Sequence, residues 1–538
     1  MPRYLTVLIC VLPWLLTTRC LAQTDVESTK CSNTDFSQVL SCYKNKLPTE
    51  PLIYNLLSQE NLPGLEWRRY QLTSQHWSPE GLVTPAAWQH EVEVFIPSES
   101  TSKQGLVVIN NGTNHATDKV PASGPTDFSI DELQNIARQT NTVVIAVSTI
   151  PNQYLEYQQD NEPRKEDYSV ARSWTLFMDA PESRAIVPLQ VPMAAAISQA
   201  MTMAQQALPE KALDSFIVTG LSKRGWTTWL TAIADSRVVA IAPFVIDLLD
   251  TRAALEHMYQ SYGGNWPIAF TPYYLDEVDK KLDTAGFAKL MQIIDPLQYM
   301  GTEYQSRLSI PKYIINASGD DFYVPDNTDF YYDKLPGEKA LRVAPNSSHS
   351  GIKAFSGPSL ISFVNRMRQS MPMPQVNANI AIKDKVQTLT VSLSETPDKV
   401  LLWTAANSEA RDFRYACNVR YSEFPLAVTP ANTLDIALTV PTSGWQATFV
   451  EATFSDGFVA TTPVYILPKD VYPTTAPPVV GAACKTLPGR NAIAASEVTT
   501  QIDTAQHRKV YSHNFAIQSG IQAIKNPAET GFPVYTLT

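Results

Sequence analysis

The amino-acid sequence predicts an α/β protein, in which a mostly parallel sheet flanked by helices is followed by a small antiparallel β-sandwich. Three observations lead to this fold class. Apolar β-rich runs alternate with helical patterns between residues 105 and 370, which is typical of a parallel sheet. Within that region a strand, a sharp turn and a helix follow one another directly at residues 216–233. Beyond residue 376, short alternating strands separated by proline and glycine turns replace the helical patterns.

Length and composition indicate more than one domain and exclude two classes of partner. At 538 residues the chain is long enough for two or three domains with a large core. Its net charge of −10 and the lack of a basic run argue against nucleic acid and against an anionic membrane surface. No spacing of cysteine and histidine indicates a metal site, and no cofactor is expected.

The first 22 residues have the features of a secretory signal peptide. Arg3 precedes an apolar core at residues 5–16, and Cys20-Leu21-Ala22 has the pattern of a small-residue cleavage site. The core is short for a membrane span, although a retained anchor is the alternative. No later run approaches about 18 apolar residues, so the mature chain is expected to be extracellular and free of the membrane.

The patterns predict four segments after the signal peptide. A weakly patterned extension covers residues 23–60, and the α/β domain covers residues 61–371. An aromatic helical insertion is expected at about 252–300, where it either covers a pocket or serves only as packing. The β-sandwich covers residues 376–470, and the tail at 471–538 has no pattern that compels a fold.

Four cysteines remain after removal of the signal peptide, and an even number in an oxidising compartment predicts two disulfides. The favoured pairing is Cys31 with Cys42, which closes a short loop, and Cys417 with Cys484, which fastens the tail to the β domain. Free buried thiols are the alternative.

Three N-glycosylation sequons occur, at Asn111, Asn316 and Asn346. Asn316 is the least suited of the three as an acceptor, because it lies at the end of a predicted buried strand. A sequon only permits modification, so all three stay candidates.

The strand, turn and helix at residues 216–233 have a serine at the turn. Gly220 precedes Ser222 by two residues and Gly225 follows it by three, which gives the spacing G-x-S-x-x-G. A serine held between glycines at such a junction has the geometry of a nucleophile elbow, in which the hydroxyl stands above the carboxyl end of a parallel sheet. The backbone N–H of Lys223, at the start of the helix, could then face a developing oxyanion. The alternative is a glycine-rich turn with an incidental serine.

A second oxyanion donor is expected from the turn-rich loop at residues 110–115, which follows a fully apolar strand. In a hydrolase of this layout the loop at this place supplies a backbone N–H, so Gly112 and Thr113 are the candidates. An ordinary surface loop is the alternative.

An acid and a histidine follow two later predicted strands. Asp321 is favoured as the acid by its distance from the following Val-Pro pair, and Asp320 is the close alternative. His349 lies in the loop after the last predicted strand of the domain. The chain order Ser222, acid, His349 is that of the α/β-hydrolase fold, whose members use serine, histidine and an acid as a catalytic triad.

Two basic residues, Lys223 and Arg224, stand beside the candidate nucleophile. They either favour an acidic acyl group or assist the oxyanion, or Arg224 points back and pairs with an acid such as Asp295.

The chain resembles the PhoPQ-activated pathogenicity-related proteins between about residues 50 and 470, and the serine motif is the most specific part of the resemblance. The resemblance implies a secreted protein of α/β-hydrolase fold with an appended β-sandwich, and some eukaryotic members are growth inhibitors related in fold to dipeptidyl peptidases. The matching stretches are Gly-Leu-Ser-Lys-Arg-Gly-Trp-Thr-Thr-Trp from 220, Asn-Ala-Ser-Gly-Asp-Asp-Phe from 316, Leu-Pro-Gly-Glu from 335, Glu166-Asp167 with Ser173-Trp174, Asp295-Pro296-Leu297, and Arg411-Asp412-Phe413-Arg414.

Two functions are therefore expected as alternatives. The first is a secreted serine hydrolase, acting on a peptide, with release of a dipeptide as one case, or on a carboxylic ester, and regulating growth of its own source cells. The second is a signalling protein without catalysis, which uses the hydrolase fold to bind a cell-surface receptor. Carbohydrate binding by Trp403 and Trp445 of the sandwich is a weaker third option. The sequence does not define the substrate or the oligomeric state.

Overall fold

A computed structural model describes residues 31, 35–47, 52–118, 120–160, 162–383 and 386–490. The expected signal peptide and the last 48 residues of the expected tail, from 491 to 538, lie outside the described residues.

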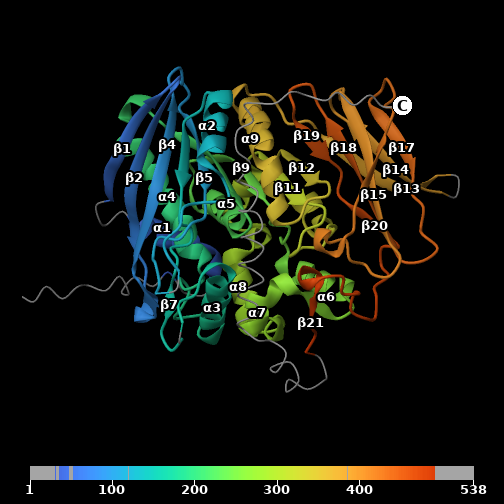
Figure 1. The fold of residues 1–538 in the computed structure, drawn as a ribbon, viewed down its shortest axis with the longest axis horizontal. Coiled ribbons are helices and arrows are strands. Elements are labelled where there is room, and N and C mark those ends of the chain that lie inside the picture. Colours follow the sequence, from blue (N-terminus) through green and yellow to red (C-terminus); the bar gives the residue numbers. More distant parts are fainter. Residues whose placement is uncertain are drawn as a thin grey trace, which may run out of the picture.

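A nine-stranded mixed sheet forms the centre of the protein (Figure 1), with the strand order β1-β2-β4-β6-β5-β8-β9-β11-β12. The first three strands pair antiparallel, and the six from β6 to β12 pair parallel, as the alternation of strands and helices predicted. The strands are β1 (Ile53–Leu62), β2 (Leu65–His76), β4 (Ala87–Pro97), β5 (Gln104–Ile109), β6 (Val144–Val147), β8 (Ser215–Leu221), β9 (Val238–Phe244), β11 (Lys312–Ala317) and β12 (Lys339–Ala344).

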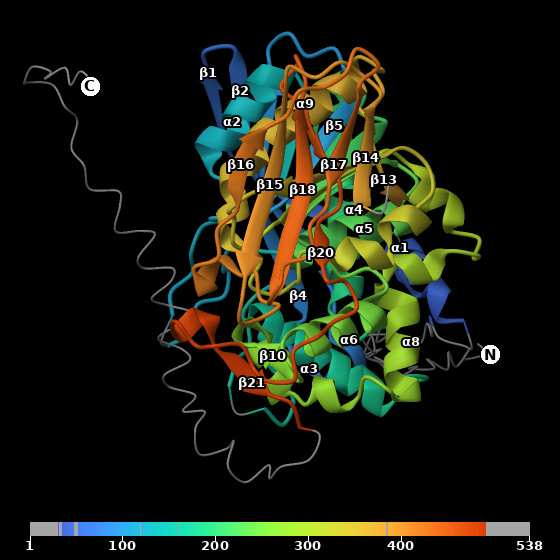
Figure 2. The ribbon, with the colours of Figure 1, turned by 90° about the vertical axis from the view of Figure 1, so that its right-hand side faces the viewer.

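Both faces of the sheet are covered, which explains why its parallel strands are mostly apolar and do not alternate with polar residues. In β5 the side chains alternate: Leu106 and Val108 belong to one apolar cluster, and Val107 and Ile109 belong to the other. Helices lie on both sides of the sheet, as Figures 1 and 2 show. One face carries α2 (Ile130–Thr140) and α9 (Lys353–Arg368), and the other carries α1 (Val39–Lys46), α4 (Gln190–Ala207) and α5 (Lys223–Ala234).

The carboxyl end of the parallel strands is closed by helices that gather at the lower end of the sheet in Figure 1. Aromatic rings pack these helices together: Tyr273 lies 5.2 Å from Trp174 and 4.8 Å from Phe270, between ring centroids. These rings are buried against one another. The elements at this end are α3 (Glu166–Asp179), α6 (Thr251–Ser261), β10 (Asn265–Pro267), α7 (Thr271–Leu275) and α8 (Ala285–Ile294), with the two-stranded β3 (Val83–Thr84) and β7 (Glu156–Tyr157) nearby.

Two antiparallel sheets follow the α/β domain, at the right of Figure 1 and facing the viewer in Figure 2. They dock beside β12, where Val343 N–H donates to Thr461 Oγ1 at 3.0 Å and the Tyr313 ring stacks on Phe458. This contact covers one edge of the central sheet. The first sheet has β13 (Val376–Lys383), β14 (Val386–Leu393) and β17 (Thr433–Ala437), and the second has β16 (Ser422–Pro425), β15 (Lys399–Asn407), β18 (Trp445–Thr453), β19 (Val459–Thr461) and β20 (Tyr465–Leu467).

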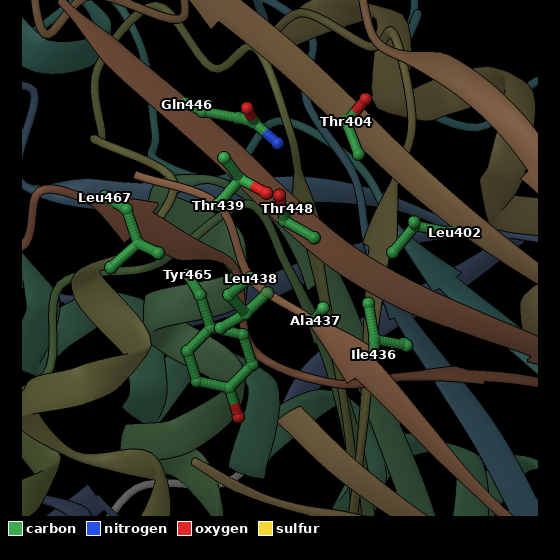
Figure 3. Close-up of a pocket in the computed structure, with 10 residues that line it drawn as sticks. All are labelled: Leu402, Thr404, Ile436, Ala437, Leu438, Thr439, Gln446, Thr448, Tyr465 and Leu467. Atoms are coloured by element: carbon green, nitrogen blue, oxygen red, sulfur yellow. The ribbon is translucent and has the colours of Figure 1, made fainter. Parts of the chain in front are cut away.

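A small pocket lies between the two antiparallel sheets (Figure 3), with a volume of about 50 Å³. Leu402, Ile436 and Tyr465 are among its lining side chains. Sites for small molecules are typically about 300–1,000 Å³ in volume, so this pocket is a packing gap between the sheets. Nearby, Trp445 is buried and donates its ring N–H to Val471 O at 2.8 Å, which makes it a packing residue of the sandwich.

The chain after residue 470 returns to the α/β domain, although its sequence had predicted no fold for it. The short strand β21 (Thr486–Pro488) pairs antiparallel with β10. Just before it, Cys484 forms a disulfide with Cys417, and near the amino end Cys31 forms one with Cys42. Both predicted pairings are therefore confirmed.

Candidate active site

Ser222 stands between β8 and α5 in a backbone conformation that non-glycine residues rarely adopt, with φ 58° and ψ −126°. The two glycines of the motif make this turn possible. A Cβ at position 220 would lie 2.7 Å from the Arg224 carbonyl oxygen, and one at Gly225 would lie 2.7 Å from the Phe244 carbonyl oxygen. The spacing G-x-S-x-x-G thus has a steric cause, and the turn is the predicted nucleophile elbow in geometry.

Hydrogen bonds fix the turn on both sides of the serine. The Ser222 N–H donates to Phe244 O of the neighbouring strand, and its carbonyl accepts from Trp226 N–H, both at 2.9 Å. Lys223 is the first residue of α5, so its backbone N–H has no acceptor within the helix. It therefore stays a candidate oxyanion donor.

His349 is paired with Asp320, the alternative acid, and not with the favoured Asp321. The ring Nδ1 of His349 lies 3.0 and 2.9 Å from the two carboxylate oxygens of Asp320. Because a carboxylate only accepts, Nδ1 carries the hydrogen and Nε2 is left as the acceptor. The choice of Asp321 is therefore corrected, because the turn after β11 directs the first of the two acids at the ring.

The two acids have different environments. Asp320 also accepts the backbone N–H groups of Phe322 and Tyr323, at 2.7 and 3.3 Å, which hold the carboxylate in place. Burial of the Asp321 carboxyl together with the Asp320 charge raises the pKa of Asp321 to about 6.

The His349 ring is largely buried, with 15% of its side chain exposed. Burial opposes a charged ring, but the adjacent carboxylate of Asp320 outweighs burial and raises the pKa of His349 above its ordinary value. The Phe322 ring lies 4.6 Å from the imidazole between centroids and covers part of it.

Ser222, Asp320 and His349 follow β8, β11 and β12, whose carboxyl ends point to the same edge of the sheet. In the part of the chain that the structure describes, the Ser222 hydroxyl makes no hydrogen bond to the His349 ring. Such bonds are often long in unliganded enzymes and tighten with substrate. The structure thus joins the acid to the base and places the serine at the same edge.

The loop after β5 leaves one of its two candidate donors available. Thr113 N–H donates to Ser123 O at 2.9 Å, so Thr113 is wrong as an oxyanion donor. The Asn111 carbonyl accepts a hydrogen bond from Thr149 N–H at 2.9 Å. In a trans peptide the carbonyl and the following N–H point in opposite directions, so the Gly112 N–H points away from Thr149. Gly112 is buried, and its N–H has no acceptor among the described residues. Buried backbone donors without a partner are rare, so this one is a candidate functional group.

The basic residues beside Ser222 are neutralised. Lys223 Nζ lies 2.7 Å from Glu166 and 3.1 Å from Asp167, and Arg224 lies 2.6 Å from Glu166 and 3.2 Å from Asp127. Arg224 therefore pairs with acids, as the second interpretation expected. The proposed partner was wrong, because Asp295 caps α6 by accepting from Thr251 N–H.

Residues from the C-terminal part brace the loops of the acid and the histidine. The Tyr415 N–H donates to Gly319 O at 3.0 Å, next to Asp320. Asn346, three residues before His349, uses both ends of its amide: Nδ2 donates to Tyr421 O at 2.9 Å, and Oδ1 accepts Tyr421 N–H at 2.7 Å.

The three sequon asparagines are all hydrogen-bonded. Asn346 makes the contacts just described, and Asn316 is 4% exposed with its Nδ2 donating to Tyr331. Asn111 Nδ2 donates to Thr126 Oγ1 at 2.8 Å. Glycosylation stays a prediction, and Asn316 is again the least suited acceptor.

The described residues contain one group of potential metal ligands, formed by Asp412, Cys417 and Cys484. The two cysteines are joined as a disulfide, so they offer no thiolate. No helix among the described residues has the length and apolar character that crossing a membrane requires.

The fold and the site define a protein of the α/β-hydrolase fold with a serine elbow and a paired histidine and aspartate. The family model of the PhoPQ-activated pathogenicity-related proteins matches residues 40–414, and the chain belongs to this family. The expected family resemblance is thereby confirmed. The chain is also similar to autocrine proliferation repressor protein A of Dictyostelium discoideum, with 30% identity over 406 residues, which cover 71% of this chain and 79% of the relative.

Solved structures of esterases have a related arrangement. Acetyl xylan esterase 1 from Thermoanaerobacterium sp. JW/SL YS485 is 14% identical with a TM-score of 0.39, covering 62% of this chain and 95% of the esterase. An acetyl xylan esterase from Paenibacillus sp. R4 is 16% identical with a TM-score of 0.43, covering 63% and 97%. At this distance the likeness carries no statement about substrate.

Proposed function

We propose that this protein is a serine hydrolase that cleaves an acyl bond through Ser222, His349 and Asp320. The pairing of the His349 ring with the Asp320 carboxylate is the observation that carries the proposal, because it leaves Nε2 as the acceptor that a general base needs. Ser222 and His349 also follow strands whose carboxyl ends lie at the same edge of the sheet. In the acylation step Nε2 takes the hydroxyl proton while the serine oxygen bonds to the carbonyl carbon. The proton then passes to the leaving group as its bond to the carbonyl carbon breaks. In deacylation Nε2 takes a proton from water, the water oxygen bonds to the acyl carbon, and the bond to the serine oxygen breaks as the serine regains its proton.

The negative charge on the carbonyl oxygen requires donors. We assign this role to the backbone N–H groups of Gly112 and Lys223, which follow the adjacent strands β5 and β8 and have no acceptor among the described residues. The neutralised charges of Lys223 and Arg224 give no preference for an acidic acyl group. The proposed substrate is therefore a carboxylic ester or a peptide, with release of a dipeptide as one case.

The test compares hydrolysis of p-nitrophenyl acetate and of a dipeptide p-nitroanilide by the wild-type protein and by Ser222→Ala. The proposal predicts that at least one substrate is cleaved by the wild-type protein and that the alanine variant loses this activity while it remains folded. Equal rates for the two proteins would refute it.

Secretion and growth regulation are part of the same proposal. Two disulfides suit an extracellular protein, and the relative's name connects it with autocrine repression of proliferation. A test is whether the chain, expressed in its own cells, is found in the medium without residues 1–22.

The second candidate function is that of a secreted signal that binds a cell-surface receptor without catalysis. Two observations favour it: the relative's name, and the lack of a hydrogen bond between Ser222 and His349 in the described chain. The discriminating experiment adds purified wild-type protein or Ser222→Ala to growing cells. Equal repression by both supports the receptor function, and repression by the wild type alone supports the hydrolase.

A further inference from the structure

The carboxylate of Glu166 connects the two segments that carry the candidate oxyanion donors, which are the loop after β5 and the amino end of α5. Its Oε1 accepts from Arg224 Nη2 at 2.6 Å and from Gln153 Nε2 at 3.0 Å. Its Oε2 lies 2.7 Å from Lys223 Nζ. Arg224 and Lys223 are the first two residues after the elbow, so these contacts hold the amino end of α5.

Gln153 extends the connection to the loop after β5. The same Nε2 that donates to Glu166 also donates to the Gly112 carbonyl at 2.7 Å, and Gln153 Oε1 accepts Glu166 N–H at 2.9 Å. Gln153 is 3% exposed, so its amide has little water to replace these partners. The Gly112 carbonyl is held by this amide, and the next N–H is held by Ser123, so the peptide unit after Gly112 is fixed at both ends.

Glu166 is suited to this position because it stays ionised. Burial opposes its charge, but Arg224 and Lys223 outweigh burial and hold the pKa of Glu166 well below its usual range. An anionic carboxylate can serve three donors at once, which a neutral amide cannot do.

We propose that Glu166 is a positioning residue that fixes the Gly112 loop against the amino end of α5. Each of these two segments carries one of the proposed oxyanion donors. This inference rests on the proposed hydrolase function and extends it beyond the triad. Glu166 would not touch the substrate; its effect would pass through Gln153 on one side and through the basic pair on the other. A displacement of about 1 Å between the two donors is enough to cost about 100-fold in rate.

The test uses Glu166→Gln, which keeps the shape and removes the charge, and Gln153→Met, which removes the link to Gly112. Asp167→Asn is the matched control, because Asp167 contacts Lys223 and Tyr273 but neither Gln153 nor Gly112. We expect kcat to fall about 10-fold or more in the first two variants, with KM within about threefold. The kcat/KM profile should keep its rise with pH, because Asp320, which raises the pKa of His349, is untouched.

Amide hydrogen exchange of residues 110–115 is measured on the same samples. Faster exchange in Glu166→Gln and Gln153→Met than in Asp167→Asn would support the positioning role even if the wild-type protein proved inactive, an outcome that would refute the proposed hydrolase function alone. The inference is overturned if both folded variants keep wild-type kcat, or if the loop exchanges at the same rate in all four proteins.

Discussion

Replacing Asp320 by asparagine tests which of two adjacent acids orients the histidine. Both carboxylate oxygens of Asp320 lie within 3.0 Å of His349 Nδ1, and an amide can offer only one oxygen there. The amide NH₂ group would favour the tautomer with the hydrogen on Nε2, which cannot accept the serine proton. In serine proteases the same change costs about 10⁴-fold. Here we expect kcat to fall about 10³-fold, which equals a loss of about 4 kcal/mol of transition-state stabilisation.

Asp321→Asn is the matched control, because it makes the same chemical change one residue away. Asp321 has no hydrogen bond to the ring, so we expect its loss to lower kcat less than about 10-fold. The Phe322 and Tyr323 N–H groups can still bond the asparagine oxygen at 320, so that variant should fold.

The pH profile gives a second readout for the Asp320 variant. Asp320 raises the pKa of His349 against the opposing effect of burial, and the base works only when neutral. Wild-type kcat/KM should therefore rise with pH through a midpoint above about 6.5, and Asp320→Asn should move that midpoint to lower pH. The assay is ester hydrolysis from pH 5 to 9, with circular dichroism to check the fold. Equal losses from the two variants, or a midpoint that does not move, would refute the reasoning.

Three further predictions concern the contacts that brace the site. Asn346→Ala should destabilise the protein by about 1–3 kcal/mol and lower kcat, since two backbone groups lose their partner; a melting curve and a rate measurement check this. Replacing both Cys417 and Cys484 by serine should lower the free energy of unfolding by about 2–4 kcal/mol, because the disulfide spans 67 residues. An unchanged midpoint of urea unfolding would contradict this. Gly319→Ala should lower activity because its Cβ would lie 2.7 Å from Tyr415 N, and wild-type kinetics would count against the brace.

The sequence predicted the parts of the fold that local pattern controls. Strands buried on both faces, such as β5, are continuous apolar runs, and the elbow needs glycine where neighbouring backbone comes within 2.7 Å. Disulfide pairing was predictable because cysteine numbers leave few combinations. These features depend on residues close together in the chain or on strict chemical pairing.

The sequence could not decide features set by backbone direction or by distant partners. Asp320 and Asp321 are chemically equal, and only the turn after β11 decides which one meets His349. The roles of Gln153 and Glu166 depend on contacts with Gly112 and α5, which are distant from them in the sequence. For Glu166 the only signal was its place in the family resemblance. Strand β21 has three residues, too few for any pattern.

The most direct test of the hydrolase proposal is covalent labelling of the purified, disulfide-bonded protein with a fluorophosphonate, followed by peptide mass analysis. We expect one label, on Ser222, at a rate that rises with pH and falls strongly in His349→Ala. A folded wild-type protein that stays unlabelled, or one that is labelled equally fast without His349, would contradict the account.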